Sequence, residues 1–475
     1  MGTTQLAGRR EWLGLLVLVL PTLLVALDMT ALFLALPRLS ADLGASRIQQ
    51  LWISDSYGFL VAGFVITMGT LGDRIGRRRL LLVGAAGFLV MSLVGAYATS
   101  PELLIAARAL QGVAGATLMP STLALISNMF RDERQRGKAI AAWATCQFAG
   151  GALGPVVAGL LLQHFWWGSV FLMSVPMLGL LLILGPALLP EFRNPDAGRI
   201  DPRSVALSLV AVLPVVYGLK QLTVDGAQNL TVPLGAIAFG VAVGVVFVRR
   251  QLRLTTPLLD LRLLRNPAFT AVLIGLVLAG IAMAGCGLLV TQYLQNALGF
   301  GPLAAALLFC PMGIGVAIGT MTAPMLARRM AVSTAITSGL CVSVLGCLAL
   351  TAAHGGAALP LVIVGITVLA LGAGPLFALG TGLVVGSVPP ERAGSAASMS
   401  ETSNYLGGSL GIAVLGAVGA AVYRLNLAGG PVAASTVGLN VVGLVAAVLF
   451  AVIAVLVATR RTRTESAPVE LVSRS

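Results

Sequence analysis

Charge is the scarcest feature of this chain. Only 10% of the residues are Asp, Glu, Lys or Arg, whereas 57% are hydrophobic and the mean hydropathy is +0.97. A soluble protein of 475 residues needs more charge than this to stay dispersed. The composition therefore excludes a soluble enzyme or binding domain. It predicts an all-α polytopic membrane protein.

Several motifs that carry chemistry are also missing. The sequence has no phosphate-binding loop of the G-x-x-x-x-G-K-[ST] type, which argues against ATP-driven transport. The five cysteines lie in apolar runs without CxxC or metal-ligand spacing. The two histidines, His164 and His354, are too far apart in sequence to suggest a site. We therefore expect no metal, no cofactor and no enzyme activity.

The positive charge is unevenly distributed. The net charge of +13 would suggest nucleic acid as a partner of a soluble protein, but 25 of the 30 Lys and Arg fall in segments expected on the cytoplasmic side. The other five are Arg38, Arg47, Arg108, Lys220 and Arg424. Basic loops stay cytoplasmic, so the excess indicates topology and attraction to anionic lipid heads rather than nucleic acid binding.

Apolar runs of about twenty residues predict fourteen membrane spans. The spans are expected at 12–36, 50–71, 80–98, 102–128, 138–162, 167–189, 203–221, 231–248, 268–294, 302–325, 333–352, 358–384, 395–423 and 435–458. The first run resembles a signal peptide, but it is too long and lacks a convincing cleavage site, so we expect it to be retained. Alternating the spans from a cytoplasmic N-terminus puts the basic connections 131–138, 191–203, 249–265 and 328–329 inside, and the even number of spans then places the C-terminus there too. We expect the protein in the cell (inner) membrane.

Two polar segments, 190–202 and 249–267, divide the spans into groups of six, two and six. We therefore expect an N-terminal six-helix half at 1–190 and two inserted helices with their loops at 191–265. A C-terminal six-helix half at 266–459 and a cytoplasmic tail at 460–475 follow.

One short basic segment, Gly69–Leu82 (GTLGDRIGRRRLLL), separates the second and third runs. One acid, its neighbouring glycines and two of the arginines stand at fixed offsets: Gly69, Asp73, Arg74, Gly76 and Arg77. A positive-inside loop explains the arginines but not the Gly, Asp and Gly spacing. The pattern G-x-x-x-D-R-x-G-R-R-R resembles the loop between helices 2 and 3 of the major facilitator superfamily of secondary transporters. This resemblance implies the fold of that superfamily.

Four charged residues fall well inside spans: Asp28, Asp55, Arg108 and Glu401. An ionised side chain at the middle of a bilayer costs about 2.5 to 3.5 kcal/mol even on the lenient insertion scale, so each is a candidate functional residue. Desolvation and neighbouring charges let such carboxylates exchange protons near neutral pH. Arg108 keeps its charge and can stabilise a nearby carboxylate.

Structural roles remain open for each of the four. The alternative for Asp28 is a packing residue bonded to a hydroxyl such as that of Thr30. The alternative for Asp55 is a solvated residue near the outer end of its helix. The alternative for Arg108 is a fixed ion pair with Asp55 or Asp28. Glu401 is either a proton site, the counter-charge for a cationic substrate, or a residue that snorkels to the inner interface.

The fifth span contains GGALGPVVAGLLL, with four backbone-shaping residues at Gly150, Gly154, Pro155 and Gly159. Pro155 is expected to kink this helix, and the glycines allow tight contact with a neighbour. The pattern is similar to a motif of drug:proton antiporters. Together with LDMT in the first span, the L-x-x-x-R-x-x-Q-G pattern around Arg108 and the number of spans, it resembles the fourteen-helix drug:proton antiporter family. The likeness is strongest to bacterial exporters of quaternary ammonium compounds and cationic dyes.

The resemblance implies roles for the residues named above. Asp28 and Glu401 would be substrate or proton carboxylates, and Arg108 would belong to a proton relay. Asp73, Arg74 and Arg77 would form a cytoplasmic latch between conformations. Gly154 and Pro155 would seal the interface of the fifth helix against leak.

The function implied is export of lipophilic, cationic drugs in exchange for protons by alternating access of two halves. The partners would be these small molecules, protons and membrane lipids. Two other functions remain open. A dedicated exporter of one antibiotic or metabolite would share every motif, and a channel or non-transporting sensor belongs to another class.

Overall fold

The computed structural model of the chain describes residues 6–193, 201–224, 230–254, 257–259, 261–353, 358–389 and 392–464. These residues form helices and the turns between them. A helix satisfies its backbone hydrogen bonds within itself, which is what an apolar run needs in hydrocarbon surroundings.

The first bundle consists of the helices that precede residue 190. Its members are α1 (Arg9–Leu43), α2 (Arg47–Ile75), α3 (Arg77–Ala96), α4 (Pro101–Met129), α5 (Glu133–His164), α6 (Ser169–Leu172) and α7 (Ser174–Leu188). Two helices follow, α8 (Pro202–Val224) and α9 (Thr231–Arg253), which pack against each other and are called the hairpin below.

The second bundle contains the remaining helices, with three π-helical turns and a 3₁₀ turn among them. Its members are α10 (Pro267–Gln292), η3 (Tyr293–Ala297), α11 (Pro302–Arg329), α12 (Val332–Thr351), α13 (Ala358–Pro375), η5 (Leu376–Gly380), α14 (Thr381–Gly386), α15 (Ala393–Leu410), η7 (Gly411–Leu415), α16 (Gly416–Leu425), η8 (Leu427–Gly429) and α17 (Pro431–Thr464). The 3₁₀ turn η2 (Leu261–Arg265) precedes α10.

The prediction of an all-α protein with fourteen spans agrees with the structure. Thirteen helical segments among the described residues are long and apolar enough to cross a membrane, and the bent helix α5 brings the number to fourteen. Two details differ from the sequence prediction. The span expected at 167–189 is divided at Met173 into α6 and α7, and most helices extend past the apolar runs because their polar ends continue the same hydrogen-bond pattern.

Local sequence explains where several helices begin. Ser46 and Gln49 form a capping box at the start of α2, and the side chain of Ser100 accepts a hydrogen bond from Leu103 at the start of α4. Asp132 caps α5 in the same way. Gly76 ends α2 with a φ of 112°, a conformation that L side chains rarely adopt, so the chain can turn at once into α3.

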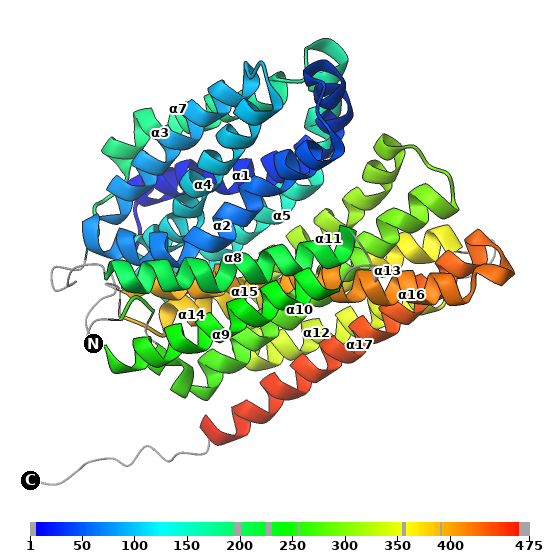
Figure 1. Cartoon of the computed structure of the whole chain (residues 1–475). Helices are drawn as coiled ribbons and strands as arrows, with labels where there is room; N and C mark the ends of the chain where they lie inside the picture. Colours follow the sequence, from blue (N-terminus) through cyan, green and yellow to red (C-terminus); the bar gives the residue numbers. More distant parts are fainter. Residues whose placement is uncertain are drawn as a thin grey trace, which may run out of the picture.

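The two bundles meet at one end of the molecule, which we call the latch end (Figure 1). Here α2 ends and α15 begins, and these two helices are in contact. The beginning of α1 and the end of α17 lie at the same end, while the bundles diverge toward the opposite end. Helices α5 and α11 form a second contact between the bundles, where the hydroxyls of Thr145 and Thr320 are 2.7 Å apart.

Candidate functional site

A buried ion pair lies at the centre of the first bundle. Arg108 of α4 donates from Nη1 to Asp28 Oδ2 of α1 over 2.6 Å, and the two residues are 1% and 3% exposed. The hydroxyl of Thr30 donates instead to the carbonyls of Ala26 and Leu27. Of the arrangements left open by the sequence, the structure therefore selects the pair between Arg108 and Asp28.

Three further side chains contact the guanidinium of Arg108, and a fourth is bonded to one of them. Gln111 accepts a 2.8 Å hydrogen bond from Nη1 and donates one of 2.9 Å to Ser92 of α3. The rings of Tyr57 and Phe171 have their centroids 4.6 and 5.8 Å from the guanidinium carbon. Helices α1, α2, α3, α4 and α6 thus all contribute to one charged centre, and cation–π contacts help to compensate for the lost hydration of Arg108.

Glu401 lies on the opposite side of the interface, in α15. It is 1% exposed, so it does not snorkel to an aqueous surface. Neither carboxylate oxygen makes a hydrogen bond to any described residue. The amide side chains of Gln147 and Asn404 lie beside it but do not reach hydrogen-bonding geometry. A carboxyl group in such a place can take up a proton or face a cation that enters from outside the protein.

Two tyrosines interact electrostatically with the carboxyl groups of the two bundles. Tyr57 of α2 is within electrostatic reach of Asp28 and of Tyr405, and Tyr405 of α15 is within electrostatic reach of Glu401. The hydroxyl of Tyr57 is buried and makes no hydrogen bond to a described residue. Electrostatic interactions thus run from Asp28 through Tyr57 and Tyr405 to Glu401. Asp55 lies two residues before Tyr57 in α2 and is half-buried.

The latch residues join the two bundles. The carboxylate of Asp73, near the end of α2, accepts hydrogen bonds from the backbone N–H groups of Gly394 (3.3 Å) and Ser395 (3.0 Å). These donors belong to the first turn of α15, where N–H groups have no partner within the helix. An acidic group at a helix N-terminus is stabilised by about 0.3 to 1 kcal/mol, and by up to about 2 kcal/mol when partly buried.

Arg77 completes the latch. Its buried guanidinium donates to the carboxylate of Asp73 and occupies the space beside Gly394 where a Cβ would stand. At Gly69, an added Cβ would lie 2.5 Å from the Cβ of Ser398, so the backbones of α2 and α15 are in close approach there. Arg74 is partly exposed at the same end, and its Nη1 has no hydrogen bond to a described residue.

The start of α3 has an acidic cap of its own, which sequence reasoning missed. Glu191 accepts hydrogen bonds of 3.0 and 3.1 Å from the backbone N–H groups of Arg78 and Arg79. It is the first acid after the last apolar run of the first bundle, and that position was the available signal. Gln111 was also missed as a ligand of Arg108, although it stands one helical turn further along α4.

Helix α5 packs its glycine-containing face on α1. An added Cβ at Gly150 would lie 2.5 Å from the carbonyl oxygen of Leu23, and one at Gly154 would collide with the hydroxyl of Thr30. The two parts of α5, Glu133–Gly151 and Leu153–His164, meet at an angle of 45°.

Proline removes a backbone hydrogen bond and clashes with the carbonyl four residues earlier, so Pro155 accounts for a bend just after Gly151. Gly159 is half-buried in the same helix.

A sequence model described as Major Facilitator Superfamily matches residues 18–412. The chain belongs to the major facilitator superfamily. It is a multi-pass membrane transporter and not an enzyme, as the sequence predicted.

Two bacterial relatives of this superfamily member match nearly its whole length. It is 44% identical over 425 residues to the multidrug efflux pump LfrA of Mycolicibacterium smegmatis, covering 90% of this chain and 84% of LfrA. It is 34% identical over 420 residues to the methyl viologen resistance protein SmvA of Salmonella typhimurium, covering 86% of this chain and 82% of SmvA.

A solved structure shares the fold of this superfamily member. The crystal structure of the human organic anion transporter MFSD10 (TETRAN) superimposes with a TM-score of 0.67 over 94% of this chain and 99% of that chain. The two sequences are 16% identical, so the likeness concerns the fold alone.

The contact between Arg77 and Gly394 yields a first prediction. The substitution Gly394→Ala places a methyl group where the guanidinium lies, so Arg77 must move and its bond to Asp73 is lost. We expect a loss of about 1 to 3 kcal/mol in the free energy of unfolding, measured by thermal unfolding of the purified protein. The matched control is Gly408→Ala in the same helix, because no atom lies within 4 Å of its added Cβ. Equal stability of the two variants would contradict the packing described here.

Proposed function

We propose that this chain is a proton-coupled exporter of lipophilic cations that works by alternating access. The first and second bundles rock about the interface between them, with the pair of Asp28 and Arg108 inside the first bundle and Glu401 in the second. Protons enter from outside, and the substrate leaves the cytoplasm or the inner leaflet. Both termini and the latch end lie on the cytoplasmic side in this proposal, so the structure corresponds to a conformation closed toward the cytoplasm.

The observation that carries the proposal is the environment of Glu401. A buried carboxylate without a hydrogen bond is costly, and the cost is removed either by a proton or by a bound cation. These two occupants exclude each other because each neutralises the same charge. Mutual exclusion at one carboxyl group is the minimum requirement for exchange of a proton against a cationic substrate.

Asp28 is a second carboxyl group for proton uptake, and unlike Glu401 it has a cationic partner within the protein. Asp28 Oδ2 lies 2.6 Å from Arg108 Nη1. When a proton neutralises Asp28, Arg108 loses its ionic partner and keeps its contacts with Gln111 and the two aromatic rings. Because an arginine keeps its charge in protein surroundings, Arg108 changes its partners rather than its protonation. In our proposal this change of partners links protonation to movement of α1 against α4.

The two relatives support the class of substrate. One is named a multidrug efflux pump, and the other is named for resistance to methyl viologen, an organic dication. We propose that this chain likewise exports several organic cations and that Glu401 is their counter-charge. Two protons exchanged for one monovalent cation would use the membrane potential, about 2.3 kcal/mol per charge per 100 mV, whereas one proton would not.

Transport in everted membrane vesicles tests the proposed function. The vesicles accumulate an ethidium-like cation, and the pH gradient and the membrane potential are collapsed separately. We expect accumulation to stop when the pH gradient and the membrane potential are both removed. Accumulation driven by the potential alone would indicate two protons per monovalent cation. Accumulation that persists without any proton gradient, or no accumulation at all with a panel of organic cations, would refute proton-coupled export of cations.

Substitution of Asp28 separates transport from stability. Asp28→Asn leaves Arg108 buried without its ionic partner, so we expect lost transport and a loss of about 3 to 5 kcal/mol in stability. The double variant Asp28→Asn with Arg108→Gln removes both charges and should recover most of the stability without recovering transport. Recovery of pH-driven transport in the double variant would show that the pair serves folding only.

Substitution of Glu401 should have the opposite effect on stability. Glu401→Gln removes a buried carboxylate that has no hydrogen bond to a described residue, so thermal stability should be unchanged or higher. Efflux of cations should fall at least about tenfold, which corresponds to about 1.4 kcal/mol of lost interaction. Glu133→Gln is the control, since Glu133 is an exposed acid at the start of α5. Equal losses for cationic and neutral substrates would rule out a counter-charge at Glu401.

A further inference from the structure

The hairpin lies between the two bundles rather than beside one of them. Helix α8 contacts α2 of the first bundle on one side, and α15, η7 and α16 of the second bundle on the other (Figure 1). On α2, Gly63 allows Leu209 and Leu213 of α8 to approach closely. Any separation of α2 from α15 must therefore displace α8 from at least one of them.

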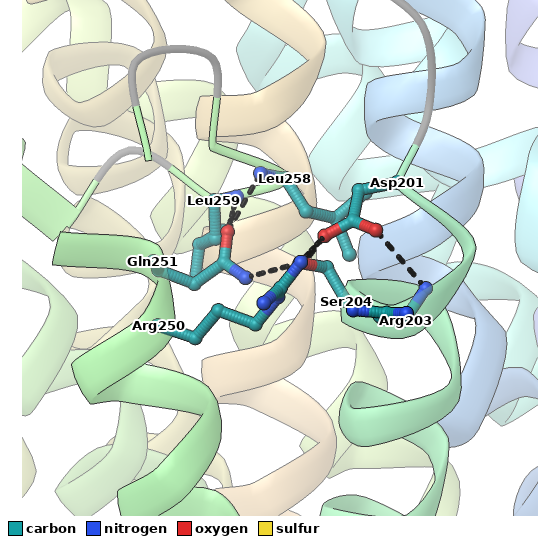
Figure 2. Close-up of polar contacts among 7 residues, drawn as sticks. All are labelled: Asp201, Arg203, Ser204, Arg250, Gln251, Leu258 and Leu259. Carbon is teal, nitrogen blue, oxygen red and sulfur yellow. Dashed lines mark hydrogen bonds and ion pairs between the residues drawn. The ribbon is translucent and has the colours of Figure 1, made fainter. Parts of the chain in front are cut away.

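A polar cluster fixes the end of the hairpin that lies at the latch end (Figure 2). Arg250 of α9 donates to Asp201 Oδ2 from Nε over 3.0 Å and from Nη2 over 2.5 Å, and Ser204 of α8 donates to the same oxygen over 2.9 Å. The hydrogen bonds from Arg250 and Ser204 hold the pKa of Asp201 below its ordinary value. The carboxylate therefore stays ionised at neutral pH, and α8 and α9 remain joined there.

Gln251 extends this cluster to the chain that follows α9. Its side chain is buried, its Nε2 donates to Ser204 over 2.9 Å, and its Oε1 accepts from the backbone N–H groups of Leu258 (2.7 Å) and Leu259 (3.3 Å) (Figure 2). One amide side chain thus satisfies two buried backbone donors and fixes residues 257–259 against the hairpin.

Residues 257–259 in turn hold α2. The hydroxyl of Thr70 lies 2.7 Å from the carbonyl oxygen of Leu258 and 3.1 Å from that of Ile66 in its own helix, so the shorter bond goes to Leu258. Thr70 stands one turn before the latch residue Asp73. The two leucines are 2% and 8% exposed and share one apolar cluster with Val65 of α2 and Phe269 of α10. Residues 257–259 therefore connect α2, at the latch end, to the beginning of the second bundle.

We propose that the hairpin and residues 257–259 form a brace that holds the latch end closed, with Gln251 and Thr70 as its positioning residues. The brace acts independently of the bond between Asp73 and α15. When the latch end opens, either the bond between Thr70 and Leu258 breaks or the buried leucines leave the second bundle. This proposal rests on the proposed function in one respect, which is that the bundles alternate between two arrangements.

Variants of Thr70 test the hydrogen bond from its hydroxyl to the carbonyl of Leu258. Thr70→Val keeps the shape of the side chain and removes the donor, whereas Thr70→Ser keeps the donor and should restore the behaviour of the unaltered protein. The matched control is Thr67→Val, since Thr67 lies one turn earlier in α2 and its buried hydroxyl has no hydrogen bond to a described residue. Gln251→Met is an independent variant that removes the acceptor for Leu258 and Leu259.

The readout is the distance between spin labels at Arg79 and Arg329, measured by pulsed electron spin resonance on the full chain in lipid nanodiscs after replacement of the native cysteines. Both residues are exposed, and they belong to different bundles. We expect Thr70→Val and Gln251→Met to raise the ratio of separated to closed populations roughly fivefold, the effect of losing one buried hydrogen bond. Thr70→Ser and Thr67→Val should leave this ratio unchanged.

Two results would contradict the proposed brace. The first is that Thr70→Val has the same distance distribution as the control Thr67→Val. The second is that Thr70→Ser shifts the distribution as much as Thr70→Val does. Asp73→Asn serves as the positive control for separation of the latch end. If the distance is unchanged in Asp73→Asn as well as in Thr70→Val, the result counts against alternating access. The spin-label distance is measured without substrate or gradient. The vesicle assay therefore tests the proposed function separately.

Discussion

An ionised side chain removed from water must be compensated, and this constraint governs each functional part of the molecule. The pair between Arg108 and Asp28 is compensated internally by charge, by Gln111 and by two aromatic rings. Glu401 is buried to the same degree without a hydrogen bond to a described residue. The buried charge of the first bundle thus has an ionic partner, whereas the carboxyl group of the second bundle has no hydrogen-bonding partner among the described residues. In our proposal this difference leaves Glu401 available to a proton or a cation.

The latch end uses a weaker form of the same compensation. Asp73 is paired with Arg77 of its own bundle, and across the interface it is satisfied by backbone N–H groups at the N-terminus of α15. Glu191 caps the N-terminus of α3 in the same way within the first bundle. Contacts of this kind are worth about 0.3 to 2 kcal/mol, depending on burial. They suit an interface that must close firmly and still open repeatedly. The bond between Thr70 and Leu258 adds a neutral contact of similar strength at the same end.

The sequence predicted much of the fold because bilayer thickness sets the length of each apolar run, and these runs appear directly in the residues. It also marked Asp28, Arg108 and Glu401, since charge is rare inside spans. It left two partners open for Arg108 and an aqueous position open for Glu401, because pairing and burial depend on how distant helices pack. The bond between Thr70 and Leu258 joins residues 188 positions apart, and the three π-helical turns have no periodic signal, so neither was predictable. The domain bounds and the roles of the site residues remain predictions.

The most direct measurement of the central claim is proton release when a cation binds to the purified protein. In weakly buffered detergent solution near neutral pH, a pH indicator reports protons that leave carboxyl groups as an organic cation such as methyl viologen is added. The account predicts proton release that follows the binding curve of the cation and disappears in the Glu401→Gln variant. Saturable binding of the cation without release of protons at any pH between about 5 and 8 would contradict it.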